Sequence, residues 1–419
     1  MDIDKIFLQR RGDRRYNTSY PLSPADWAQY NVRSRLGLDA DKPMAFYIHI
    51  PFCGQLCRFC EYTRMITPSP EIQRHYLDTL RKDIEAFEKI YPDVELYGFD
   101  IGGGTPTALS NDNFRALMSL YKAIAESHPK TADFEPSIEA TFQTFNKAKA
   151  EAIIDAGIKR ISFGIQSSTK SILRPQHRIS ADIDLMLSRM AMAYEAGINK
   201  INADLMYGLP GQSAETIAAD LETIKALNPE QVTVYEFRTN MVEAQVCGDT
   251  FSQYTQLYDG LTQMGYAGQL GRNTFTKSAE DCGVSSYLRH RMFDGWQYKG
   301  FGISAQSMSS HGISYNQGKN HISMDCVLAT SYESDCHYAL PPEELLAKYI
   351  AISGYAGRFS TTVASSILGT DFSEKYKDVI DYLLEQGYIT IDGDTIALTT
   401  QGVANYGAAL SMFWNNTIR

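Results

Sequence analysis

The stretch AFYIHIPFCGQLCRFC, residues 45–60, decides how the rest of the chain is interpreted. Its first six residues are mostly apolar and β-favouring, which predicts a short buried strand that ends at Pro51. Cys53, Cys57 and Cys60 follow, with three and then two residues between them. Closely spaced thiolates on one loop are the ligands that iron–sulfur clusters take. The stretch therefore predicts a strand followed directly by a metal-binding loop.

The number of these cysteines favours a 4Fe–4S cluster, because three ligands leave one iron open for a small molecule. A structural zinc site takes four ligands. The other cysteines, at positions 247, 282, 326 and 336, show no paired CxxC spacing, and His49 precedes the loop on the strand. A reducing compartment disfavours disulfides. Zinc and disulfide bonds are therefore the weaker interpretations of this loop.

Beyond the loop, strand-like segments alternate with amphipathic helical segments. The predicted strands are 95–100, 136–140, 160–164, 200–206 and 231–236, and the helices between them include 111–126, 146–156, 182–196 and 213–227. Such alternation predicts an α/β fold built from βαβ units around a parallel sheet. We expect a partial or full TIM-like barrel over residues 41–340, with the functional loops at the carboxyl ends of the strands.

The two ends of the chain differ from this pattern. Residues 1–40 are predicted to form an irregular N-terminal arm rich in Arg and Tyr. After Pro341, three predicted helices (343–352, 361–368 and 373–386) precede a hairpin with an Asp-Gly turn. This order indicates a C-terminal winged-helix-like α+β domain over residues 341–419. Its helices are acidic, so we interpret it as a lid or packing domain rather than a DNA-binding one.

The composition excludes several classes of partner. The chain has 39 basic and 49 acidic residues, a formal net charge of −10, which argues against nucleic acid as the main ligand. It contains no run of about 20 apolar residues that could span a membrane, and its charged N-terminus lacks the apolar core of a signal peptide. We expect a cytoplasmic protein that acts on a small-molecule substrate, without membrane or nucleic-acid partners.

Five motifs occur in the order and at the spacing of one enzyme family. They are YIHIPFC (47–53), GGGTPT (102–107), FGIQS (163–167), INADLMYGLPGQS (201–213) and GFGISAQS (300–307). Together they resemble the oxygen-independent coproporphyrinogen III oxidase branch of the radical S-adenosylmethionine (SAM) enzymes. Residues 14–21 resemble the N-terminal element that reaches into the active site of those enzymes.

The resemblance implies that Cys53, Cys57 and Cys60, hereafter the cluster cysteines, hold a 4Fe–4S cluster. The open iron then chelates SAM, and an electron from a donor such as flavodoxin cleaves SAM to a 5′-deoxyadenosyl radical. By the same resemblance the SAM contacts are Gly102, Gly103, Gly104, Thr105, Glu139, Gln166, Arg178 and Asp204. A second SAM would lie near Gly302, Ile303 and Ala305, and Tyr47 and Tyr62 are the candidate catalytic side chains.

The chain departs from the family on the substrate side. Tyr62 occupies the position where the family has a fourth cysteine. The amino-acid sequence also differs from that of the family in two segments, 235–241 and 268–277, which line the substrate cavity in such barrels. These departures favour a class C methyltransferase or cyclopropanase that uses a second SAM on a secondary-metabolite precursor. The alternative is oxidation of coproporphyrinogen III propionates to vinyl groups. Haem ring-opening methylation and a haem chaperone are the remaining alternatives.

Overall fold

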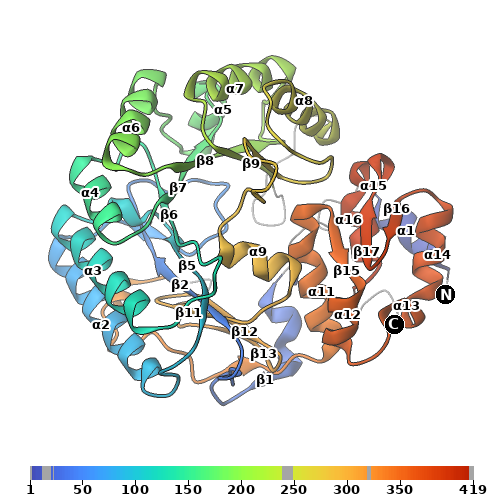
Figure 1. The fold of residues 1–419 in the computed structure, drawn as a ribbon, viewed down its shortest axis with the longest axis horizontal. Coiled ribbons are helices and arrows are strands. Elements are labelled where there is room, and N and C mark those ends of the chain that lie inside the picture. The colour runs from blue at the N-terminus through green and yellow to red at the C-terminus, as the bar shows by residue number, and fades with distance from the viewer. Residues whose placement is uncertain (1, 12–19, 22, 238–248, 319–321, 415–419) are drawn as a thin grey trace.

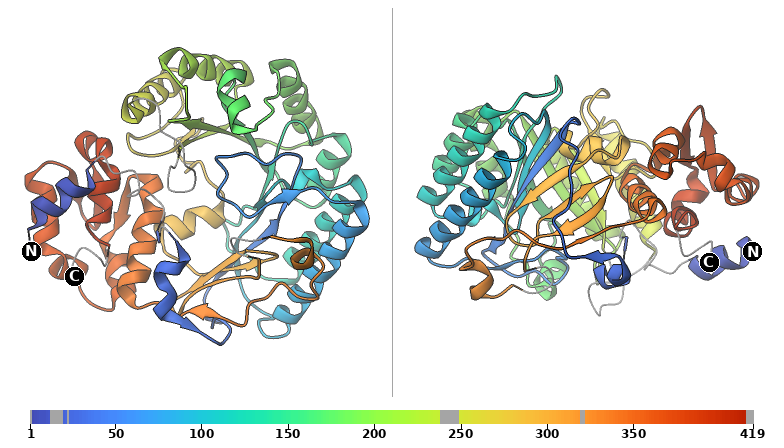
Figure 2. Two further views of the ribbon diagram at one scale, coloured as in Figure 1. Left: turned by 180° about the vertical axis from the view of Figure 1, so that it is seen from behind. Right: turned by 90° about the horizontal axis from the view of Figure 1, so that it is seen from below.

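The computed structural model describes residues 2–11, 20–21, 23–237, 249–318 and 322–414. A curved sheet with helices along its outer face forms the larger part, and a smaller domain of helices and a short sheet lies beside it (Figure 1). Figure 2 shows the same two parts from behind and from below. None of the helices in these ranges is long and apolar enough to cross a membrane.

Six parallel strands form the centre of the large sheet, and each follows its neighbour in sequence order. They are β2 (Met44–Ile50), β5 (Leu96–Gly103), β6 (Ser137–Ala140), β7 (Arg160–Gln166), β8 (Lys200–Tyr207) and β9 (Gln231–Glu236). The connecting helices are α2 (Pro70–Glu88), α3 (Asn111–Ser127), α4 (Lys147–Asp155), α6 (Ile183–Ala196) and α7 (Ala214–Leu227). The α/β fold, its strands and these helices are thus confirmed.

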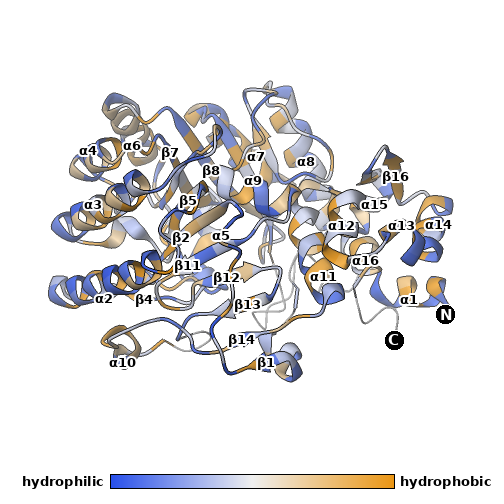
Figure 3. Cartoon of the chain, turned by 60° about the horizontal axis from the view of Figure 1, so that its bottom comes forward, coloured by the Kyte–Doolittle hydropathy of each residue, from blue (hydrophilic) through white to orange (hydrophobic). Residues whose placement is uncertain are grey.

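The alternation along β2 shows how this sheet is stabilised. Phe46, Ile48 and Ile50 are fully buried in the same core as Leu77 and Leu80 of α2. Hydrophilic residues (blue) follow one another along α2 and α3 in Figure 3, with hydrophobic residues (orange) recurring between them. The helices therefore cover the outer face with apolar stripes, and the side chains between those core positions of β2 point to the inner face of the sheet.

The barrel is partial, because the two edges of its sheet do not pair with each other. One edge is β10 (Thr274–Thr276), which runs antiparallel to β9 after α8 (Thr250–Gln263). On the other side, β11 (Tyr298–Phe301) lies parallel to β2. The sheet then continues through β12 (Gln306–Ser309), β13 (Gly312–Tyr315), β14 (His337–Tyr338) and β1 (Asn31–Val32). The helix α9 (Ser286–Phe293) lies between the barrel and the smaller domain (Figure 1).

The C-terminal domain has the predicted helices and hairpin together with a third strand. Its helices are α11 (Pro342–Ser353), α12 (Thr361–Leu368), α13 (Phe372–Lys375), α14 (Lys377–Glu385), α15 (Thr400–Ala404) and α16 (Tyr406–Ser411). Its strands β15 (Arg358–Ser360), β16 (Ile389–Asp392) and β17 (Thr395–Leu398) pair in the order β15-β17-β16. The single helix predicted over 373–386 is two helices that meet at Tyr376.

The N-terminal arm begins within the core of this domain. The helix α1 (Ile3–Arg10) places Phe7 against the rings of Tyr382 and Tyr388, and it lies beside the C-terminal domain in Figure 1. The short helix η1 (Pro24–Tyr30) follows. Residues 14–19 of the predicted active-site element lie outside the described residues, whereas Tyr20 is buried against Trp27 and Trp414. The domain limits 40/41 and 340/341 stay predictions.

Candidate functional site

A cavity of about 560 Å³ opens at the carboxyl ends of the parallel strands. Loops and strand ends of the barrel form most of its wall, and the C-terminal domain and α1 complete it. The wall contains the cluster cysteines and, among the predicted SAM contacts, Gly103, Gly104, Thr105, Glu139, Gln166, Arg178 and Asp204. Residues that lie far apart in the sequence, such as Cys53 and Asp204, therefore meet at one site.

Cys53 is the last residue of β3 (Phe52–Cys53), and Cys57 and Cys60 lie on the loop that leads from it to β4 (Met65–Ile66), which pairs with β3 in parallel. Cys53 and Cys57 are buried and Cys60 is half-buried. Burial raises the pKa of Cys60 to about 11, and it also raises the pKa of Cys53, although the Thr105 hydroxyl donates to its Sγ over 3.7 Å. These thiols stay protonated until a metal displaces the protons.

The donor set fits a cluster better than a single metal ion. Within the ranges that the structure describes, no three His, Cys, Asp or Glu side chains converge closely enough to hold one ion. Cysteines around a four-iron cube stand farther apart than the ligands of one zinc ion do. All three cluster cysteines face the same cavity. The loop thus fits a 4Fe–4S cluster with one iron left open toward the cavity.

The triple glycine allows three close approaches that a side chain would block. A Cβ on Gly102 would lie 2.6 Å from the carboxyl carbon of Glu139, and one on Gly104 would lie 2.9 Å from the carbonyl oxygens of Ile50 and Phe52. Gly103 has a φ of +110°, and a Cβ there would lie 2.5 Å from the ring of His49. The bare backbone therefore brings β5, β6 and the cysteine loop together.

Two carboxylates face the cavity from β6 and β8, the strands on either side of β7. Glu139 of β6 accepts a hydrogen bond from the Gly103 N–H at 3.1 Å, and enclosure in the barrel raises its pKa to about 7. Asp204 of β8 accepts from Ser162 at 2.8 Å and from Asn202 at 2.7 Å, while burial raises its pKa above the ordinary value. Both pKa shifts arise from the loss of water, so a cationic ligand would stabilise the charged form of each group.

Gln166 and Arg178 approach the site from the end of β7 and the loop behind it. Gln166 has a φ of +70°, which is unusual for a residue with a side chain and is common at functional sites. The Arg178 guanidinium donates to the Gly164 carbonyl and lies 3.9 Å from the Cys57 Sγ. A Cβ on Gly164 would contact both side chains. Arg178 is thus one cation next to the cluster loop, and Arg64, which donates to the Cys57 carbonyl and also lines the cavity, is another.

The remaining predicted residues divide into three groups. Tyr62 lines the cavity, as predicted. Tyr47 and Gly102 lie one layer behind the wall. His49 Nε2 donates to the Thr63 carbonyl, so this nitrogen carries the ring proton. The other ring nitrogen, Nδ1, accepts a hydrogen bond from the Tyr47 hydroxyl over 3.2 Å. Gly302, Ile303 and Ala305 are not part of the cavity wall; Ile303 and Ala305 are buried, and the Ile303 N–H donates to the Tyr76 hydroxyl. A second SAM at these three residues stays a prediction.

Residues 47–224 match the family model of the radical SAM superfamily. This stretch is a radical SAM domain. The cofactors of this domain are a 4Fe–4S cluster and SAM, as predicted. The matched range ends inside α7, so the family model leaves β9 and the C-terminal domain unmatched.

Similar proteins extend the likeness over more of the chain. The oxygen-independent coproporphyrinogen III oxidase of Salmonella typhimurium is 28% identical over 72% of this chain and 69% of its own length. The haem chaperone HemW of Bacillus subtilis is 26% identical over 85% of this chain and 95% of its own. The solved structure of coproporphyrinogen III oxidase HemN from Escherichia coli has a TM-score of 0.73 and 22% identity, with 94% of each chain covered. That structure confirms the fold.

Sequence reasoning also located part of the cavity wall beyond the predicted SAM contacts. The segments 235–241 and 268–277 contribute Tyr235, Glu236, Gly271 and Asn273, as predicted for a substrate cavity, while 238–241 lie outside the described residues. Arg10, Tyr355 and Tyr406 were missed. Tyr355 contacts the ring of Tyr235, and the Tyr406 hydroxyl donates to Glu236. No local motif marks these residues, because only the docking of the C-terminal domain brings them to the radical SAM domain.

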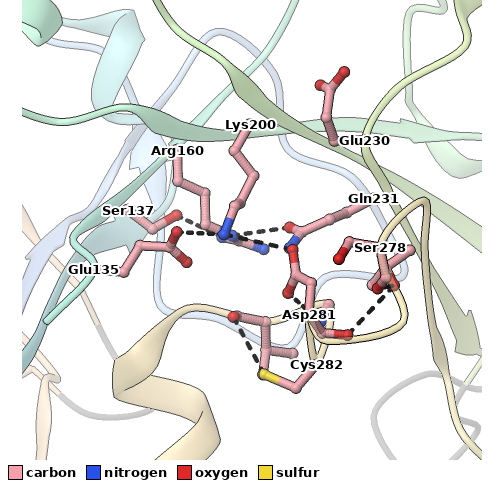
Figure 4. A network of polar contacts seen from close by, with 12 residues as sticks. Glu135, Ser137, Arg160, Lys200, Glu230, Gln231, Ser278, Asp281 and Cys282 are labelled. Carbon is pink, nitrogen blue, oxygen red and sulfur yellow. Dashed lines mark hydrogen bonds and ion pairs between the residues drawn. The ribbon is translucent and has the colours of Figure 1, made fainter. Parts of the chain in front are cut away.

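A polar network closes the opposite end of the barrel, where the strands begin. The buried Arg160 donates to Ser137 at 2.6 Å and to Gln231 at 3.0 Å, and Gln231 donates to Asp281 at 2.7 Å (Figure 4). Lys200 forms ion pairs with Glu135 and Asp281 in the same network. This arrangement leaves the carboxyl ends of the strands as the accessible side of the barrel.

Proposed function

We propose that this radical SAM enzyme oxidises a propionate-bearing tetrapyrrole of the coproporphyrinogen class and converts propionate side chains to vinyl groups. Each vinyl group formed releases one CO2 and gives up one hydrogen atom, which a 5′-deoxyadenosyl radical takes, and one electron, which an external one-electron acceptor takes. The likeness to oxygen-independent coproporphyrinogen III oxidases, which covers 72% of the chain, supports this choice over methyl transfer. The departures in sequence favoured methyl transfer, whereas the comparisons support the alternative, oxidation of propionates to vinyl groups.

The observation that carries the proposal is the form of the cavity. Its wall presents three cysteines together with Glu139, Arg178 and Asp204, and it also presents aromatic rings from the barrel and from the C-terminal domain. A volume of about 560 Å³ is typical of sites that enclose a whole organic ligand. Flat faces such as Tyr235 and Tyr355 suit a pyrrole ring system, because aromatic surfaces stack at little entropic cost.

The chain's own residues position the reactants in this proposal. When bound, the cluster and SAM supply the 5′-deoxyadenosyl radical that abstracts hydrogen. Glu139 and Asp204 accept from the SAM amino and ribose groups, and Arg178 pairs with its carboxylate. The wall contributed by the C-terminal domain excludes water, which protects a reactive radical from side reactions.

Tyr62 supports methyl transfer as the second candidate. It lines the cavity. In the family that the sequence resembles, the matching position holds a fourth cysteine. A phenol binds soft iron poorly, but it can pack against a cofactor or donate a hydrogen bond. Methyl transfer needs a second SAM, and the residues predicted to hold it do not line the cavity, so this candidate has the weaker support.

An anaerobic assay with labelled SAM and reduced coproporphyrinogen III tests the proposal. We expect 5′-deoxyadenosine and CO2 in step with vinyl formation, and no S-adenosylhomocysteine. Cys57→Ala is the matched control and should give none of these products. Production of both 5′-deoxyadenosine and S-adenosylhomocysteine from another acceptor would support methyl transfer. Stoichiometric haem binding without SAM cleavage would support a chaperone instead.

A further inference from the structure

Arg64 lies on the loop that leads from Cys53 to β4, the cluster loop, and it lines the cavity without being one of the predicted SAM contacts. It directly precedes β4, whose Met65 N–H donates to the Pro51 carbonyl at 2.8 Å. The Thr67 N–H donates to the Cys53 carbonyl at 3.0 Å. These bonds to both ends of β3 fix the backbone of Arg64 beside the start of the loop.

The Arg64 guanidinium bridges two carbonyls that lie on either side of Cys60. Its Nη1 donates to the Tyr62 carbonyl at 3.1 Å, and its Nη2 donates to the Cys57 carbonyl. The Cys57 carbonyl also accepts from the Cys60 N–H at 3.3 Å. The side chain therefore closes the turn that carries Cys57 and Cys60, and the same bonds hold its positive charge against that turn.

No carboxylate compensates this charge within the ranges that the structure describes. Arg64 forms no ion pair there, and its Nε is buried without a hydrogen-bond partner. Burial raises the pKa of the Cys53 and Cys60 thiols, and the Arg64 cation opposes this shift at both. Its attraction thus reaches two sulfurs of the loop and favours negative charge on them. In the proposed function Arg178 has the SAM carboxylate as its partner, whereas Arg64 keeps its charge for the loop.

Reduction of the cluster adds negative charge beside this cation. An external one-electron donor loses one electron and the cluster gains it, with no bond formed or broken and no proton transferred. Net charge and solvent exposure are among the factors that set the reduction potential of an iron–sulfur cluster. We propose that Arg64 is a positioning residue that raises the reduction potential of the 4Fe–4S cluster by holding an uncompensated positive charge against the cluster loop. The inference rests on the radical SAM domain and does not depend on the identity of the substrate.

Two variants of Arg64 and one control test this role. Arg64→Gln removes the charge but keeps a side chain that can donate to a carbonyl, and Arg64→Lys keeps the charge. Arg58→Gln is the matched control, because Arg58 lies on the same loop with its side chain exposed. Each reconstituted protein is reduced stepwise with dithionite in the absence of SAM. The electron paramagnetic resonance signal of the reduced cluster gives the midpoint potential, and iron content and SAM affinity are measured separately.

Arg64→Gln should lower the equilibrium constant for reduction about tenfold, which is a midpoint about 59 mV more negative for one electron. Arg64→Lys and Arg58→Gln should each stay within about twofold of the unaltered protein. An unaltered midpoint in Arg64→Gln would overturn the proposal, and weaker SAM binding in that case would make Arg64 a SAM contact instead. An equal shift in Arg58→Gln would also overturn it, because net charge alone would then explain the effect.

Arg64→Lys decides the question if Arg64→Gln takes up no cluster. An unaltered midpoint in the lysine variant then supports the proposal, and a tenfold loss overturns it. Absence of vinyl formation by the unaltered protein, with the expected midpoints in all variants, would count against the proposed function and leave this inference standing.

Discussion

Replacing Gly103 with alanine should lower the free energy of unfolding more than replacing a glycine that has free space around it, because Gly103 belongs to the tightly packed triple glycine of the site. Gly103 has a φ of +110°, and its N–H donates to Glu139. A side chain in this backbone region costs about 1–2 kcal/mol. The new Cβ would also lie 2.5 Å from the His49 ring, and forcing an extra methyl into a packed site costs about 1–3 kcal/mol. We expect a total loss of about 2–5 kcal/mol.

Gly157→Ala is the matched control for this change. Gly157 has a φ of +87°, but a Cβ added there would meet no atom within 4 Å. It should therefore lose only the backbone part, about 1–2 kcal/mol. The difference between the two losses of unfolding free energy, about 1–3 kcal/mol, measures the cost of displacing the His49 ring. The same displacement should move the Gly103 N–H away from Glu139.

Thermal unfolding and SAM binding measure the two consequences. Gly103→Ala should unfold several degrees below Gly157→Ala, since about 1 kcal/mol shifts the midpoint by about 2–4 °C in domains of this size. After cluster reconstitution it should also bind SAM more weakly, whereas Gly157→Ala should bind SAM normally. Equal midpoints and equal SAM affinities in the two variants would refute the reasoning, because they would show that the loop absorbs the methyl group freely.

Three further predictions concern the cluster and SAM contacts. Alanine at any one cluster cysteine should abolish the broad absorbance near ~400 nm that thiolate–iron charge transfer produces, whereas Cys282→Ala and Cys326→Ala should keep it; a full iron complement without one cluster cysteine would contradict the assignment. Arg178→Lys should weaken SAM binding at unchanged iron content, because lysine cannot pair with a carboxylate through two bonds; unaltered SAM affinity would leave Arg178 a structural role only. With a pKa of about 7, Glu139 is mostly protonated at pH 6 and mostly ionised at pH 8, so SAM affinity should increase about tenfold over that range. In Glu139→Gln this slope should flatten, and a persistent slope would assign the titration to another group.

The local sequence determined the elements of the barrel and the identity of the cluster ligands. Apolar runs and helical periodicity place the strands and helices within a few residues, because burial on one face is a property of neighbouring positions. The three cluster cysteines all lie within residues 53–60, so their convergence needs only a loop. The one helix predicted over 373–386 is divided at Tyr376, whose ring packs against Phe372 and Phe413. The contact between Tyr376 and Phe413 joins distant parts of the chain, and helical periodicity alone does not predict it.

Only the tertiary structure decided the packing around the site and the part of the cavity wall that the C-terminal domain contributes. Gly103 is required because His49 lies on the neighbouring strand, and Tyr406 reaches Glu236 from 170 residues away because the C-terminal domain docks there. The partial closure of the barrel depends likewise on which strands pair at the edges of the sheet. The physical reason is the same in each case: hydrogen bonds and ring contacts between distant segments form once the hydrophobic cores bring those segments together, and no local pattern of residues specifies them.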